Sequence, residues 1–141
     1  MSLGESNSDR ISCTLRGSDA VSNASSAARS FGEAQWLTDD ELARLCIIIE
    51  ELVANLYDHG GVTGEHEVEL TLASEPDGIH ITLLDPGTPF DPRTAPSSRQ
   101  RPERGGGAGI DIVRAWAEFV DYRATDQGNR LELLLPVGLQ G

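Results

Sequence analysis

The sequence predicts an α+β fold in which a mixed, mostly antiparallel sheet carries helices on one face. Alternating apolar and polar side chains predict one hairpin from residues 67–75 and 78–85, and a second from residues 118–125 and 129–137. The order of the elements is strand, two helices, hairpin, loop, helix, hairpin. Because the strands come in neighbouring pairs, this order favours such a sheet over a doubly wound parallel one.

The N-terminal part of the chain contains one predicted strand and one predicted helix. Residues 1–10 are polar, and we expect them to form a disordered tail ahead of a single domain over residues 11–141. Residues 11–17, ISCTLRG, alternate apolar and polar side chains, which predicts a strand with one buried face. Residues 19–36 are rich in alanine and serine and place their apolar side chains at near-helical spacing, which predicts a helix.

The strongest predicted element is a helix that begins at Thr38 and ends near Tyr57. Thr38 and Glu41 form a capping-box pattern, in which each side chain accepts a hydrogen bond from the other residue's backbone N–H. The apolar residues that follow form one stripe at helical spacing, so this face of the helix is predicted to be buried. The stripe consists of Leu42, Leu45, Ile48, Ile49, Leu52 and Leu56.

A long segment without periodicity separates the two hairpins. Residues 86–107 are dense in Pro, Gly, Ser and Arg, and a loop of this length inside a compact domain is usually functional or disordered. Residues 108–118 then predict a further helix.

Composition excludes several classes of function. The 141 residues carry a net charge of −12, which argues against a general nucleic-acid binder because phosphate neutralisation needs basic clusters. All 11 basic residues are arginine, so no mechanism with a catalytic lysine is available. Cys13 and Cys46 have no metal-ligand spacing and are predicted to be buried thiols. With no signal region and no apolar run of about 20 residues, we expect a cytoplasmic protein without membrane contact.

A carboxylate and an amide share one face of the long helix. Glu51 and Asn55 are four positions apart and off the apolar stripe, with His59 one turn further on. Their side chains therefore face one space. A solvated polar face would have the same pattern.

A second candidate motif lies in LLDPGTPFDP, residues 83–92, where a strand ends in a carboxylate. Asp85 at the strand end can accept a hydrogen bond from an amino group, and Gly87 two positions later lets a flat ring approach the backbone. An aspartate-capped turn is the structural alternative.

The third motif is GGGAGIDIVRAW, residues 105–116, which puts four glycines in five positions at the start of a helix. Free backbone N–H groups and the helix dipole attract phosphate at such a position. No buried strand leads into these glycines, which excludes a Rossmann turn. Arginines in the preceding loop would offset phosphate charge, although a solvated loop would look the same. These arginines are Arg93, Arg99, Arg101 and Arg104.

The three motifs, in this order and spacing, resemble the N, G1 and G2 boxes of the GHKL ATPases, named for DNA gyrase, a heat-shock chaperone, sensor histidine kinases and a mismatch-repair protein. The resemblance covers roughly residues 11–136. It implies a two-layer α/β sandwich, the Bergerat ATP-binding fold, with ATP and Mg²⁺ as cofactors. The forms E-x-x-x-N-x-x-x-H-G and D-x-G-x-x-F-D-P are most similar to those of bacterial anti-sigma-factor serine kinases.

The resemblance implies a role for each motif residue. Glu51 corresponds to the catalytic base and Asn55 to the Mg²⁺ ligand, while Asp85, with Gly87 beside it, corresponds to the residue that reads the adenine amino group. Residues 88–106 correspond to an ATP lid. The residues that would line the phosphates are Arg104, Gly105, Gly107 and Gly109.

The resemblance also implies partners and an activity. A kinase of this family binds a sigma factor and phosphorylates a serine of an antagonist protein, and family resemblance favours a homodimer. A nucleotide-gated binding module that does not phosphorylate its partner is the alternative, since Gly106 stands where many relatives carry a basic residue. The catalytic domain of a sensor histidine kinase is less favoured, because no dimerisation helix with a phosphoacceptor histidine precedes the motifs.

Overall fold

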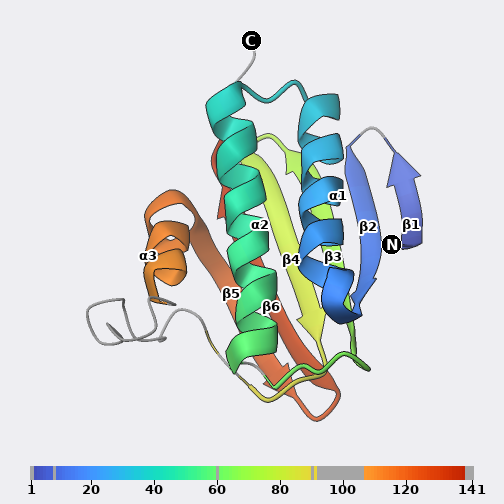
Figure 1. Ribbon diagram of the computed structural model, residues 1–141. Helices are drawn as coiled ribbons and strands as arrows, with labels where there is room; N and C mark the ends of the chain where they lie inside the picture. Colours follow the sequence, from blue (N-terminus) through green and yellow to red (C-terminus); the bar gives the residue numbers. More distant parts are fainter. Residues whose placement is uncertain (1, 8, 60, 90, 92–106, 139–141) are drawn as a thin grey trace.

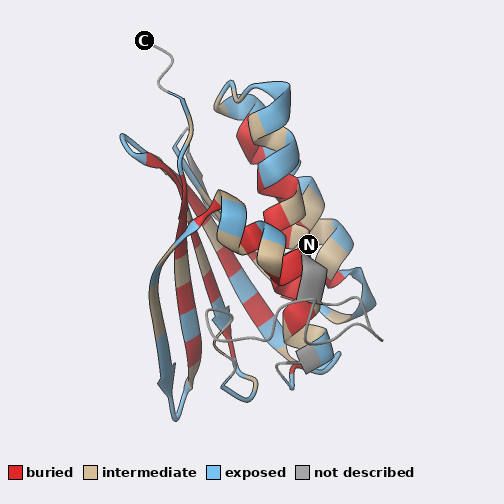
Figure 2. Cartoon of the chain, turned by 90° about the vertical axis from the view of Figure 1, so that its left-hand side faces the viewer, coloured by how far each residue is buried: buried red, intermediate tan, exposed pale blue. Residues whose placement is uncertain are grey.

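The computed structural model has two layers, an antiparallel sheet and a set of helices that covers one of its faces (Figures 1 and 2). It describes residues 2–7, 9–59, 61–89, 91 and 107–138. The predicted fold class, an α+β sandwich with helices on one face, is confirmed. Within the described ranges every pair of neighbouring strands is antiparallel.

The described sheet has six strands in the order β1-β2-β3-β4-β6-β5. They are β1 (Ser2–Asn7), β2 (Arg10–Arg16), β3 (Glu67–Glu75), β4 (Gly78–Asp85), β5 (Glu118–Thr125) and β6 (Gly128–Leu135). Both predicted hairpins are present, as β3–β4 and β5–β6. Because β6 pairs with β4, the end of β4 lies beside the start of β6, with Asp85 opposite Asn129.

The alternation that predicts the strands produces one apolar and one polar face. Leu70 lies opposite Leu83, which in turn lies opposite Leu131, and all three are buried under the helices. The other face carries polar contacts such as the hydrogen bond between Ser12 Oγ and Thr71 Oγ1 at 3.0 Å. The hydrophobic core therefore lies between the sheet and the helices (Figure 2).

The helical layer consists of the short 3-10 helix η1 (Gly17–Asp19), α1 (Ala20–Ala34), α2 (Asp39–His59) and α3 (Gly107–Trp116). Helices α1 and α2 pack side by side across the sheet, and α3 lies beside α2 (Figure 1). Small residues permit the close packing of α1 on α2, since a Cβ at Gly32 would lie 2.5 Å from Leu42 Cδ1.

Helix α2 begins with the predicted capping box. Thr38 N–H donates to Glu41 Oε1 at 2.9 Å, and Glu41 N–H donates to Thr38 Oγ1 at 3.1 Å. Glu41 Oε2 also accepts a hydrogen bond from the backbone N–H of Gly138 at 2.8 Å, which ties the C-terminal segment to this end of the helix. These bonds hold the pKa of Glu41 below its usual value, chiefly through the backbone N–H of Thr38.

Helix α1 ends in a Schellman motif that has an unusual residue at its left-handed position. Leu37 N–H donates to the carbonyl of Gly32 at 3.2 Å, and Trp36 N–H donates to that of Glu33 at 3.1 Å. Trp36 has a φ of 61°, a conformation that glycine usually supplies and that costs other residues roughly 1–2 kcal/mol. Its side chain is 83% exposed.

The N-terminus differs from the sequence expectation. Residues 1–10 are predicted to be a disordered tail, but Ser2–Asn7 form edge strand β1, paired antiparallel with β2. This segment is polar and shows no clear alternation, so periodicity does not indicate a strand there. An edge strand needs only backbone hydrogen bonds to one neighbour, and β2 supplies them.

Both predicted buried thiols, Cys13 and Cys46, are indeed buried, and neither forms a disulfide. Among the helices that the structure describes, none is both long and apolar enough to cross a membrane.

Candidate functional site

Helices α2 and α3 meet where Glu51 faces Gly109. A Cβ on Gly109 would overlap the Glu51 carboxylate, so a side chain larger than hydrogen would displace one of the two helices or the carboxylate. A second link joins the same helices further along, where the Arg44 guanidinium lies 5.6 Å from the centroid of the Trp116 ring. The first turn of α3 is thereby packed directly against the Glu51 side chain.

The carboxyl group of Glu51 has an altered acidity. Burial raises its pKa, and the negative charges of Glu50 and Asp58 raise it further. Glu50 makes a different contact, because its carboxylate accepts a hydrogen bond from Ser25 Oγ on α1 at 2.6 Å. The raised pKa and the contact with α3 make Glu51 a candidate proton acceptor.

Asn55 lies one turn beyond Glu51, about 6 Å further along the axis of α2. Its side chain is 7% exposed, and within the described part of the chain its Nδ2 has no hydrogen-bond partner. A buried polar group without a partner costs about 1–3 kcal/mol, which makes this amide a candidate group for binding a ligand. An amide can give its N–H to a phosphate oxygen or its oxygen to Mg²⁺.

Asp85 ends β4 in a nearly buried position, 9% exposed. Its Oδ1 accepts hydrogen bonds from Gly87 N–H at 2.8 Å and from Asn129 Nδ2 at 3.1 Å. Burial raises the pKa of Asp85, while these two hydrogen bonds and the nearby His66 oppose that rise. The described hydrogen bonds of this carboxylate go to Oδ1, which leaves Oδ2 for a ligand donor such as an amino group.

Asn129 is the site residue that sequence analysis missed. It is 4% exposed, and its Nδ2 also donates to the carbonyl of Gly87 at 2.9 Å. Its Oδ1 is buried and has no partner among the described residues. The sequence did contain a signal for this residue. Asn129 is a polar side chain on the inward face of β6, where the next inward residues, Leu131 and Leu133, are buried.

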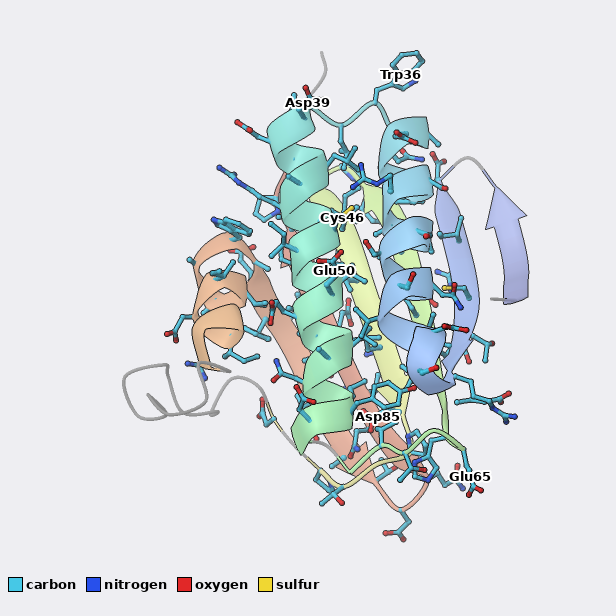
Figure 3. The ribbon with its side chains drawn as sticks, in the orientation of Figure 1. Trp36, Asp39, Cys46, Glu50, Glu65 and Asp85 are labelled. Atoms are coloured by element: carbon cyan, nitrogen blue, oxygen red, sulfur yellow. The ribbon has the colours of Figure 1, made fainter. Side chains whose placement is uncertain are left out.

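Close contacts at two glycines bring the segment after α2 and the start of β6 to the end of β4 and the residues that follow it. A Cβ on Gly61 would lie 2.7 Å from Thr88 Oγ1, and one on Gly128 would lie 2.7 Å from the carbonyl oxygen of Asp85. In Figure 3, Asp85 lies at the level of the last turns of α2. One end of the sandwich therefore brings together the C-terminal end of α2, the segment after β4 and the start of β6.

Some predicted site residues fall outside the part that the structure describes. Gly107 is the first residue of α3, and His59 is the last of α2. Of the predicted lid, residues 88–106, only residues 88, 89 and 91 are described. The predicted residues outside the described ranges are Arg93, Arg99, Arg101, Arg104 and Gly105.

Within the described ranges no three His, Cys, Asp or Glu side chains form a group that could hold a metal ion. A site for Mg²⁺ does not require such a group, because Mg²⁺ usually takes only one or two protein ligands together with phosphate oxygens and water. Asn55 is suitably placed to be such a protein ligand.

Comparisons with known proteins agree with this architecture. The sequence pattern of the family described as the histidine kinase-like ATPase domain matches residues 17–135. A search of curated proteins finds no match. Ten chains of solved structures match.

Two of these structures come from one histidine kinase. The blue-light activated histidine kinase of Erythrobacter litoralis EL346 is similar with a TM-score of 0.55 and 15% identity, over 74% of this chain and 33% of that one. Its histidine kinase domain gives a TM-score of 0.51 and 14% identity, over 84% of this chain and 59% of that one. This chain therefore spans less than two thirds of either structure, and at such identities the likeness shows the fold.

The family pattern runs from η1 to the end of β6 and includes Glu51, Asn55, Asp85 and the start of α3. By this match, the chain belongs to the histidine kinase-like ATPase domain family.

Proposed function

We propose that this chain is an ATP- and Mg²⁺-dependent anti-sigma-factor kinase that phosphorylates a serine of an antagonist protein. The observation that supports the proposal most directly is the contact between Glu51 and Gly109, in which the glutamate carboxylate lies against the first turn of α3. The kinase class rests on the resemblance of the boxes around Asn55 and Asp85 to those of the anti-sigma-factor kinases.

The described residues fit an adenine nucleotide in two places. At the end of β4, the carboxylate of Asp85 and the unpaired Oδ1 of Asn129 are buried acceptors suited to an exocyclic amino group. On α2, the unpaired Nδ2 of Asn55 is suited to donate to a phosphate oxygen, and the oxygen of the same amide is the kind of ligand that Mg²⁺ takes. Bound ATP would supply the phosphoryl group, and Mg²⁺ held by Asn55 would neutralise part of its charge.

Glu51 performs the proton transfer in this proposal. Its carboxylate would accept the proton from the serine hydroxyl of the antagonist as that oxygen attacks the γ-phosphorus of ATP; the bond from that phosphorus to the bridging oxygen breaks, and ADP leaves. Burial and the charges of Glu50 and Asp58 raise its pKa, which makes it a stronger base than an exposed glutamate while it is ionised.

The proposed partners are a sigma factor, which the protein would hold inactive, and the antagonist that it phosphorylates, with the protein itself a homodimer in the cytoplasm. The net charge of −12 is suited to partners with basic surfaces. A nucleotide-gated switch without transferase activity is the second candidate, favoured by Gly106 in the predicted phosphate turn.

Glu51→Gln separates these two functions. The variant keeps the size of the side chain but accepts no proton, so phosphate transfer from labelled ATP to a candidate antagonist should fall by about 10²–10⁴ while ATP affinity persists. Glu50→Gln is the matched control, since it removes the same charge one residue away, from a carboxylate bound to Ser25. That control should retain most of the activity.

Other outcomes decide against parts of the proposal. If Glu51→Gln transfers phosphate as fast as wild type, Glu51 is not the base. If neither wild type nor variant phosphorylates any antagonist, yet both hold a sigma factor when ATP is bound, the protein is the nucleotide-gated switch.

A further inference from the structure

Trp36 is the most exposed large apolar side chain among the described residues, at 83%. It lies in the loop between α1 and α2 and projects away from the rest of the ribbon (Figure 3). A single exposed leucine on a protein surface would need no explanation. Trp36 combines this exposure with a φ of 61°, which a bulky side chain rarely adopts.

The local fold does not need a tryptophan at this position. The Schellman hydrogen bonds of Trp36 and Leu37 involve backbone atoms alone, and glycine is the residue that favours the left-handed position. The apolar contact that accompanies the motif comes from Leu37, whose Cδ1 would lie 3.2 Å from a Cβ on Gly32. Trp36 therefore combines a strained backbone conformation with a ring that is 83% exposed among the described residues.

Three exposed acidic residues lie within four positions of Trp36 in the sequence. Glu33 precedes it by one turn of α1, and Asp39 and Asp40 follow it in the first turn of α2; all three are exposed. Figure 3 shows Trp36 and Asp39 at the same end of the molecule. An aromatic face beside carboxylates attracts an arginine side chain, whose guanidinium can stack on the ring and pair with the acids.

We propose that Trp36, with Glu33, Asp39 and Asp40, forms a docking surface for an arginine-containing basic segment of a partner protein. This surface lies at the N-terminal end of α2, whereas the candidate nucleotide site lies toward its C-terminal end. Helix α2 has 21 residues and is about 30 Å long, so the partner would not compete directly with nucleotide. The inference does not depend on phosphate transfer and stands if the proposed kinase activity fails.

The test uses the full chain and synthetic peptides as probes. A 12-residue peptide of alternating arginine and leucine is titrated against the protein, and the same peptide with glutamate for arginine is the negative probe. In a Trp116→Phe background, Trp36 is the single tryptophan, and its fluorescence reports contact with the peptide. We expect the arginine peptide to change this fluorescence and the glutamate peptide to leave it unchanged.

Trp36→Gly is the decisive variant, followed by calorimetry with the arginine peptide. Glycine removes the ring and relieves the left-handed strain, so the peptide Kd should rise at least about tenfold while Tm stays equal or rises by about 2–4 °C. The double change Asp39→Asn and Asp40→Asn should weaken binding and reduce its dependence on salt. Asp126→Asn, an exposed change in the turn after β5, is the control for lost charge and should leave the Kd unchanged.

Three results would overturn the proposal. Equal peptide affinity in wild type and Trp36→Gly would show that the ring takes no part in binding. A lower Tm in Trp36→Gly would show that the ring serves the fold. Sedimentation in which wild type self-associates and Trp36→Gly does not, without peptide binding by either, would assign the surface to a second copy of the chain.

Discussion

Asn129 donates a hydrogen bond to Asp85 at 3.1 Å, between two side chains 44 positions apart in the sequence. The two residues lie opposite one another in the register of β4 and β6. The pairing of the strands therefore fixes the direction in which the Asp85 carboxylate points. Asn129 also holds the carbonyl of Gly87, so one amide orients both parts of the predicted adenine-binding segment.

Asn129→Ala should lower ATP affinity by about tenfold, which corresponds to about 1.4 kcal/mol. The change frees Asp85 and Gly87 and removes a buried acceptor that suits the adenine amino group. Gln127→Ala, in the exposed turn before β6, is the control and should bind ATP as wild type does. Calorimetry with ATP and GTP checks the prediction, and equal ATP affinity in Asn129→Ala and wild type would contradict it.

Asp85 should give the stability of the protein a defined dependence on pH. Its pKa is raised in the folded protein above the ordinary value of 3.8, so the folded state holds the proton more tightly than the unfolded chain. The free energy of unfolding should therefore fall as pH rises from about 4 through the raised pKa. Asp85→Asn removes this contribution, and the Tm of the variant relative to wild type should increase over that interval.

Asp85→Asn should also abolish most ATP binding at neutral pH. The amide can turn its N–H toward the adenine amino group, and two hydrogen-bond donors that face each other cannot form a hydrogen bond. Asp126→Asn, in an exposed turn, controls for the loss of one negative charge. Tm values measured across the pH range, with ATP calorimetry at neutral pH, test both statements. A Tm difference between Asp85→Asn and wild type that is constant with pH would refute the assigned role of this carboxylate in stability.

Gly109→Ala should disrupt the contact between α2 and α3. The added Cβ would overlap the Glu51 carboxylate, so either that side chain turns away or the start of α3 moves. We expect both ATP affinity and phosphate transfer to fall. Gly64→Ala is the matched control, because a Cβ there would meet nothing closer than Gly17 Cα at 4.0 Å. Similar nucleotide affinity in the two variants would argue against a phosphate site at this turn.

Local patterns in the sequence predicted most of the fold. Alternation between turn residues identified both hairpins, and the reciprocal bonds of Thr38 and Glu41 are those that the capping-box pattern predicts. Strand β1 was missed because an edge strand of polar residues carries no such pattern. Its position depends on pairing with β2, which is a tertiary contact.

The candidate site was predictable where one element holds neighbouring groups, as for Glu51 and Asn55 on α2. Contacts between distant elements were not. The approach of Gly109 to Glu51 depends on how α3 packs on α2, and the bond from Asn129 to Asp85 depends on the β4–β6 register. Neither relationship has a local signal, because both follow from packing of the whole sandwich.

Asn55→Leu should stabilise the protein without nucleotide and remove its response to nucleotide. The Asn55 side chain is 7% exposed, and its Nδ2 has no partner among the described residues, so a leucine with the same branched skeleton removes an unpaired polar group. Relief of about 1 kcal/mol corresponds to a rise in Tm of about 3–5 °C for a domain of this size. Leucine supplies neither an oxygen for Mg²⁺ nor a donor for phosphate. Saturating ATP and Mg²⁺ should raise the Tm of wild type if the site binds nucleotide as proposed, and that rise should be absent in Asn55→Leu.

The control for this change is Ala54→Leu, which enlarges a half-buried neighbour on α2 and leaves the Asn55 amide in place. That variant should keep its Tm rise on addition of ATP and Mg²⁺, whatever its own Tm. Thermal unfolding of the three proteins with and without nucleotide distinguishes the outcomes. A lower Tm for Asn55→Leu than for wild type in the absence of nucleotide would mean that the amide serves the fold. A retained nucleotide-dependent rise in Asn55→Leu would mean that Asn55 lies outside the binding site, and Glu51 would then have to act without a metal ligand one turn away on the same helix.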